Sequence, residues 1–239
     1  MRKMRCRQGL CLAAWLGLLG SAASRAEQFW VRYEGDDYPE NQGWERAYAD
    51  EHGPGSGGAV RSLADGVLTL DGLYSNAVVD FYWRDRAIDP GPGELFVAEW
   101  RVLVDPASGP YDVNVGIWRA LSPGYAYFQL GPTGVRIRPA LVTIGLEEGV
   151  FHSYRFESVD MRSFTLDIDG SITFAGSFYD NTTLQYSVGF GDTVDGQASR
   201  SQWDYVRYGI VPEPASVAGL ACLLASSWLR PALRQATTP

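Results

Sequence analysis

Apolar residues in the central part of this chain recur at every second position. In the stretch ELFVAEWRVLVD the alternate residues are Phe96, Ala98, Trp100, Val102 and Val104. Successive side chains of a β-strand point to opposite faces, so this spacing predicts strands buried on one side. Turn residues interrupt such stretches about every 8–12 residues, and helical periodicity is almost absent. The alternation therefore predicts an all-β fold.

The same pattern continues along the chain in roughly 13 short runs, a number that suits a two-sheet antiparallel sandwich of the jelly-roll type. In SFTLDIDGSITFAG it predicts a hairpin, with Asp169 and Gly170 forming the turn between two strands. The inward-facing residues expected in three of these runs are Val113, Val115 and Ile117; Phe164, Leu166 and Ile168; and Leu184, Tyr186, Val188 and Phe190.

Two segments of the central region resemble a known family of β-sandwiches. The stretch FHSYRFESVDMRSFTLDIDGSITF is similar to laminin-G/concanavalin A-like jelly rolls, in which an aromatic-rich strand precedes a hairpin ending in Asp-Gly. The closing SQWDYVRYG resembles the last strand of such domains in exported bacterial proteins. The resemblance covers most of residues 27–210 and implies the fold, but a shared fold does not define a function.

The N-terminus has the features of a secretory signal peptide. Basic residues precede an uncharged apolar run of 12 residues, from Gly9 to Gly20. Small residues, Ser24 and Ala26, then form a cleavage site after Ala26. The apolar run is too short to span a bilayer. We therefore expect residues 1–26 to be removed on export and residues 27–210 to form the jelly-roll domain.

The C-terminus contains a second apolar run. Residues 215–229 carry no charge, and as a helix they would extend about 22 Å, which also suits a buried soluble helix. Small residues and the lack of a charged face favour a membrane helix instead. Arg230 and Arg234 follow the run and would stop the helix at the cytoplasmic side. The pattern predicts a C-terminal transmembrane helix.

The residues in front of that run are Val211, Pro212, Glu213 and Pro214. This motif, followed by an apolar helix and arginines, resembles the PEP-CTERM sorting signal of exported bacterial proteins. The resemblance implies that residues 211–239 are a sorting segment and that an exosortase-type membrane protease is a partner. It also implies export to the cell surface, outer membrane or extracellular matrix of a Gram-negative bacterium that makes extracellular polysaccharide.

Composition limits the chemistry of the central region. The three cysteines, Cys6, Cys11 and Cys222, lie in or beside the terminal apolar segments, so the domain has no disulfide framework and no cysteine nucleophile. Residues 27–210 contain 27 acidic residues and 13 arginines, a net charge of −14. An acidic domain of this kind is not expected to bind nucleic acid or anionic membrane surfaces.

No stretch of the sequence places acidic residues at catalytic spacing within a predicted strand. Glycosidases use two carboxylates about 5–5.5 Å apart, which in one strand requires alternate acidic residues. Asp167 and Asp169 have that spacing, but Asp169 opens the predicted turn. His152 is expected to be structural. We assign no catalytic residue, no metal site and no cofactor; calcium at Asp192 and Asp195 is a weaker alternative to their acting as turn residues.

The alternation also predicts a polar outer face that contains aromatic residues. Aromatic rings beside amides and arginines can stack on sugar rings and bond their hydroxyl groups. In the alternative interpretation, such arginines pair across strands with Asp80, Glu99 or Asp167. Tyr82 and Arg155 are expected on this face too. The candidate ligand-binding residues are Trp118, Tyr125, Tyr127, Gln129, Arg136 and Arg138.

These observations favour an exported, non-catalytic surface or matrix protein with polysaccharide as its candidate ligand. A hydrolase or lyase acting on extracellular polysaccharide is the alternative, with carboxylates or tyrosines and arginines brought together from separate strands. A structural adhesin without a sugar ligand is a third hypothesis.

Overall fold

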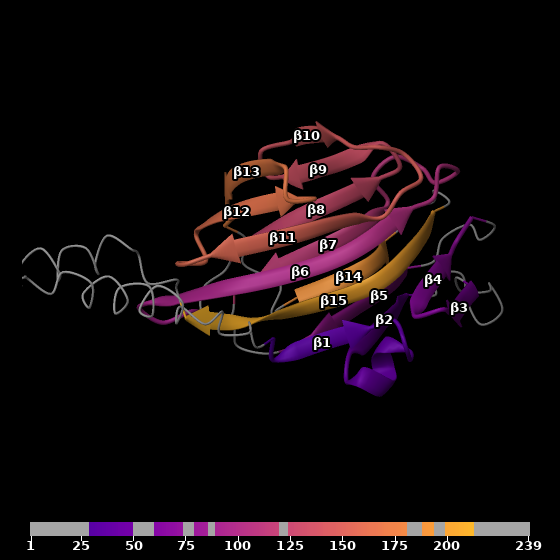
Figure 1. Cartoon of the computed structure of the whole chain (residues 1–239), viewed down its shortest axis with the longest axis horizontal. Helices are drawn as coiled ribbons and strands as arrows, with labels where there is room; N and C mark the ends of the chain where they lie inside the picture. The colour runs from indigo at the N-terminus through magenta and orange to yellow at the C-terminus, as the bar shows by residue number, and fades with distance from the viewer. Residues whose placement is uncertain are drawn as a thin grey trace, which may run out of the picture.

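The computed structural model describes residues 29–49, 60–73, 79–85, 89–119, 124–180, 188–193 and 199–212. In this part of the chain, 15 β-strands form two antiparallel sheets, with one short 3-10 helix. Figure 1 shows the strands side by side in two layers. The predicted two-sheet antiparallel sandwich is therefore confirmed.

The segments proposed as a signal peptide and a membrane helix, residues 1–26 and 215–229, lie outside the described residues, as do Glu213, Pro214, Arg230 and Arg234. Among the residues that are described, no helix is both long enough and apolar enough to cross a bilayer.

The first sheet has eight strands in the order β13-β12-β11-β6-β15-β4-β3, with β1 also paired to β15. Its longest strands, β6 and β15, lie next to each other at the centre. The strands are β1 (Val31–Glu34), β3 (Val60–Ala64), β4 (Val67–Asp71), β6 (Glu94–Val104), β11 (His152–Ser158), β12 (Ser163–Ile168), β13 (Ile172–Ser177) and β15 (Arg200–Pro212).

The second sheet has seven strands in the order β10-β9-β8-β7-β14-β5-β2. The strands are β2 (Glu45–Ala49), β5 (Val79–Arg84), β7 (Val113–Trp118), β8 (Tyr125–Gly131), β9 (Gly134–Arg138), β10 (Val142–Gly145) and β14 (Val188–Thr193). In Figure 1, β10 and β13 lie at the upper border of the two layers, and β2 and β3 lie at the lower border.

One apolar core fills the space between the sheets, and the alternation predicted its residues in β6, β7 and β12. Rings from both sheets meet there: Trp100 of β6 stacks on Tyr154 of β11, with ring centroids 5.3 Å apart, and packs against Phe128 of β8 at 5.4 Å. Val188 and Phe190 are buried as predicted, while Leu184 and Tyr186 lie outside the described residues.

The predicted hairpin turn is confirmed at Asp169 and Gly170. Their φ angles are 55° and 65°, the left-handed conformation that tight hairpin turns require. His152 holds this turn in place, because its Nδ1 lies 2.6 Å from Asp169 Oδ2 and its Nε2 lies 2.8 Å from the Glu147 carbonyl oxygen. His152 thus has the structural role that the sequence predicted.

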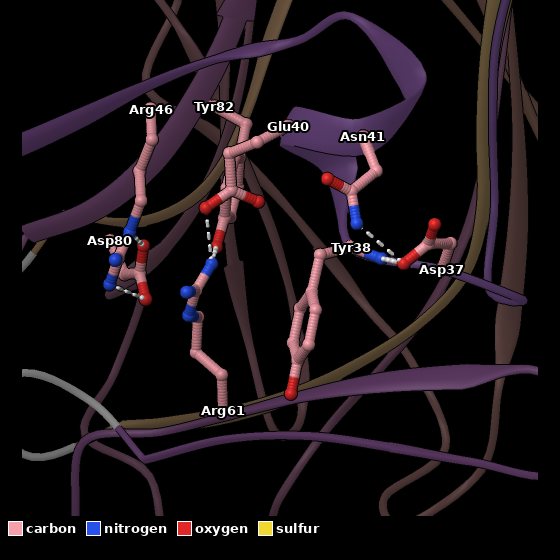
Figure 2. A network of polar contacts seen from close by, with 8 residues as sticks. All are labelled: Asp37, Tyr38, Glu40, Asn41, Arg46, Arg61, Asp80 and Tyr82. Carbon is pink, nitrogen blue, oxygen red and sulfur yellow. Dashed lines mark hydrogen bonds and ion pairs between the residues drawn. The ribbon is translucent and has the colours of Figure 1, made fainter.

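A polar network connects residues of β2, β3 and β5 with the helix η1 (Pro39–Gln42), as Figure 2 shows. Arg61 Nη1 donates to the Tyr82 hydroxyl at 2.9 Å and to Glu40 at 2.5 Å. Arg46 binds both carboxylate oxygens of Asp80, at 2.6 and 2.9 Å. The prediction that Tyr82 faces outward is wrong: it is opposite Phe190, so it points into the core, where Arg61 satisfies its hydroxyl.

The first and last described strands lie next to each other. The Trp30 amide donates to the Tyr208 carbonyl oxygen at 3.1 Å, and β1 pairs with β15. Val211 is only 6% exposed and packs in a small apolar cluster with Phe29 and Val97, on the outer face of the eight-stranded sheet. Strand β15 continues to Pro212, so the first two residues of the Val-Pro-Glu-Pro motif are part of the sheet.

Candidate functional site: the outer face of the seven-stranded sheet

Strand register places the six candidate binding residues on one surface. Tyr127 lies opposite Arg138, and Gln129 lies opposite Arg136. Trp118 lies opposite Tyr125. Their neighbours in sequence point into the core, so these six side chains are on the outer side of the sheet. We call this surface, formed by β7, β8 and β9, the aromatic face.

Trp118 is on this face but is not available to a ligand. Only 5% of its surface is exposed, which contradicts the prediction that it faces water. Its indole ring lies across Gly116, where a Cβ atom would overlap the ring. Phe81 of β5 packs against it edge-on, with centroids 6.2 Å apart. Trp118 therefore supports the aromatic face by packing and is not part of the surface that a ligand could contact.

Three tyrosines form a row beside Trp118. The rings of Tyr125 and Tyr127 meet edge to face, with centroids 6.3 Å apart. Tyr179 extends the row, with its centroid 5.5 Å from that of Tyr125. Tyr125 and Tyr127 are half-buried and Tyr179 is 46% exposed. Sequence reasoning did not include Tyr179, which follows β13 of the other sheet and forms an isolated bridge to Tyr125.

The two arginines of the aromatic face interact with neutral groups. Arg138 Nε donates to the Gln129 side-chain oxygen at 2.8 Å. The Arg136 guanidinium carbon lies 4.0 Å from the ring centroid of Tyr111, a contact that the sequence analysis did not anticipate. From β7 to β10, none of the outward-facing side chains is a carboxylate. Within the described residues, neither arginine forms an ion pair.

Arg155 was expected on the aromatic face, and this prediction is wrong. It belongs to β11 of the other sheet and binds Glu99 at 2.5 Å and Glu157 at 2.7 Å. Glu99 also binds Arg207 at 2.6 Å. Cross-strand ion pairing, the alternative interpretation, therefore holds for this opposite surface.

Asp192 is neither a turn residue nor an exposed ligand, because it lies in β14 and faces inward. Only 1% of it is exposed, and the Ser199 hydroxyl donates to its Oδ2. Its Oδ1 has no hydrogen-bond partner in the described part of the chain. Burial, with the nearby charges of Asp112 and Asp80, raises the pKa of Asp192 to about 7.

Two carboxylates of the seven-stranded sheet are buried. Asp80 is fully buried, and Asp192 is almost so. A polysaccharide would have no access to either group. Asp195, the other candidate calcium ligand, lies outside the described residues. Over the described ranges, no three or more histidine, cysteine, aspartate or glutamate side chains are grouped to hold a metal ion.

Comparison with known proteins supports the fold. No protein-family model matches the sequence, and no curated protein matches it significantly. A conserved carbohydrate esterase of the Shiga toxin-encoding bacteriophage phi24B has a similar structure, with a TM-score of 0.55 and 12% identity over 76% of this chain and 97% of that chain. A structure from work on endo-acting O-glycanases of the human gut microbiota has a TM-score of 0.51, with 13% identity over 77% of this chain and 100% of that chain.

These similarities support the architecture described above, a sandwich of two antiparallel β-sheets. At identities of 12% and 13%, they concern the fold alone.

Proposed function

We propose that this protein is an exported, non-catalytic surface or matrix protein that binds polysaccharide through the aromatic face. One observation carries this proposal. Tyr125, Tyr127 and Tyr179 form a continuous row, next to an amide and two arginines that form no ion pair within the described residues.

The residues of the aromatic face would contact different parts of a sugar. Tyrosine rings offer flat apolar area to the C–H faces of sugars, while their hydroxyl groups stay at the surface. Gln129 and Arg138 supply donors for sugar hydroxyls. Because the bond between these two side chains already restricts both, a ligand would order them at a smaller entropic cost.

The chain ends fit a role outside the cell. We propose that residues 1–26 direct export and that an exosortase-type protease processes the segment 211–239. Val211 and Pro212 belong to β15, so cleavage after Pro212 would leave the sheet intact. Mass spectrometry of the protein from its producing bacterium tests this. A mature form that ends before Pro212, or one that keeps residues 215–229, would contradict the proposal.

The binding role is tested by calorimetric titration of the full-length protein with the extracellular polysaccharide of the producing bacterium. We expect saturable binding that Tyr127→Ala weakens roughly tenfold, by loss of a stacking surface. Tyr205→Ala is the matched control, since Tyr205 is a half-buried tyrosine on the outer face of the other sheet. Absence of saturable binding would favour a structural adhesin instead.

A polysaccharide lyase is the second candidate, favoured by the position of Tyr127 opposite Arg138. An arginine can stabilise the carboxylate of a uronic acid while a deprotonated tyrosine takes the proton α to it. The bond between C4 and the glycosidic oxygen then breaks to leave a C4–C5 double bond, and the tyrosine returns its proton to the departing oxygen. Incubation with uronate polymers, monitored for unsaturated products in the ultraviolet, tests this. Products that Tyr127→Phe abolishes would establish a lyase.

A further inference from the structure

A cavity of about 450 Å³ lies at the end of the tyrosine row. Its described lining residues are Arg119, Arg162, Phe178 and Asp180. They come from three places in the chain: Arg119 follows β7, Arg162 is in the turn between β11 and β12, and the other two follow β13. The cavity thus lies where the two sheets approach each other.

Backbone hydrogen bonds hold this junction together. The Phe178 amide donates to the Arg162 carbonyl oxygen at 2.8 Å. The next residue, Tyr179, exchanges hydrogen bonds with Tyr125 at 2.8 and 2.9 Å. One short segment therefore connects the turn of the eight-stranded sheet to the tyrosine row of the other sheet. A ligand that lies along the tyrosine row could therefore extend directly into the cavity.

The side chain of Arg119 packs closely against the backbone of Gly124. A Cβ atom at Gly124 would lie 2.9 Å from Arg119 Cδ and 3.3 Å from the Tyr179 carbonyl oxygen. The arginine stem therefore lies against the Gly124 backbone and beside the last tyrosine of the row. This contact limits the conformations available to the side chain before any ligand binds.

The two arginines of the cavity belong to the half of the described arginines that form no ion pair within the described residues. Six arginines in the described part of the chain form ion pairs with carboxylates: Arg46, Arg61, Arg101, Arg155, Arg200 and Arg207. Arg119 and Arg162 form none there, although Asp180 lines the same cavity. Residues 27–210 have a net charge of −14, yet the described residues that line this cavity include two arginines and one aspartate.

We propose that the cavity binds an anionic substituent of a glycan, a carboxylate or a sulfate, while the tyrosine row stacks on the neighbouring sugar rings. Guanidinium groups match planar carboxylates and sulfate oxygens, because each presents two parallel N–H donors. The inference rests on the proposed polysaccharide binding for its glycan ligand. The cavity itself requires only an anion.

Two polymers that differ only in charge test the proposal. We would titrate the full-length protein with polygalacturonate and with its fully methyl-esterified form. The wild type should bind the charged polymer at least tenfold more tightly, and Arg119→Gln and Arg162→Gln should each remove most of that difference. Arg32→Gln is the matched control, because Arg32 is exposed, forms no ion pair within the described residues and lies in β1 of the other sheet. It should change nothing.

The outcomes separate this inference from the proposed function. Equal binding of both polymers, weakened by Tyr127→Ala but not by the arginine variants, would overturn the anion site and leave polysaccharide binding intact. If neither polymer binds, titration with sodium sulfate, followed by the melting temperature, tests the cavity alone. Stabilisation that Arg119→Gln removes would support the anion site, and its absence would overturn it.

Discussion

The two outer faces of the sandwich use arginine in opposite ways. On the eight-stranded sheet, Glu99 binds both Arg155 and Arg207, so positive charge is neutralised across three strands. On the seven-stranded sheet, Arg136 lies over a tyrosine ring and Arg138 bonds to an amide. The first face uses its charges to stabilise the sheet. The second keeps aromatic rings and unneutralised donors at the surface, where a ligand can use them.

The largest effect is expected from Gly116→Ala. The added methyl group would overlap the Trp118 ring and force it out of its buried position. We expect a loss of about 3 kcal/mol in the free energy of unfolding, together with weaker polysaccharide binding. Urea denaturation measures the first effect. Gly145→Ala, in β10 of the same sheet, is the control: no atom lies within 4 Å of a Cβ atom there, so stability should hold.

Substitutions on the ion-paired face should lower stability without changing polysaccharide binding. Glu99→Gln removes the carboxylate that two arginines share and leaves their charges unmatched. We expect a loss of about 2 kcal/mol in unfolding free energy, between the values typical of buried and exposed pairs, with unchanged polysaccharide binding. Glu157→Gln breaks only one exposed pair, so its cost should be below about 1 kcal/mol. A binding defect in Glu99→Gln would contradict the division between the faces.

A smaller effect is the pH dependence of stability that Asp192, in the seven-stranded sheet, should cause. Burial raises the pKa of Asp192 from 3.8 to about 7, so the folded state binds a proton that the unfolded chain has lost. The stability that this proton provides should therefore fall as pH rises from about 4 to about 7. Asp192→Asn should remove this dependence and raise stability at pH 8 by about 1 kcal/mol. Identical pH profiles of unfolding for both proteins would show the assignment to be wrong.

Local alternation was enough to predict the two-sheet fold, the core residues of β6 and β7, and the hairpin turn at Asp169. It also predicted that the six candidate residues share one face. Each of these features depends on the direction of neighbouring side chains within one strand or one hairpin, which a sequence displays directly.

The failed predictions depend on contacts between distant segments. Trp118 is covered because Gly116 leaves room for its ring and Phe81 arrives from β5, with β14 between them. Tyr82 lies in an apolar run without alternation, so its direction was set by pairing with Phe190. Tyr179 reaches the aromatic face only because the chain crosses from one sheet to the other after β13.

Hydroxyl-radical footprinting tests the difference between the faces most directly. The full-length protein would be oxidised with and without the polysaccharide of its producing bacterium, and each tyrosine quantified by mass spectrometry. Our account predicts protection of Tyr125, Tyr127 and Tyr179, with Tyr205 on the ion-paired face unchanged. Protection of Tyr205 alone, or of no tyrosine at a saturating polymer concentration, would contradict it.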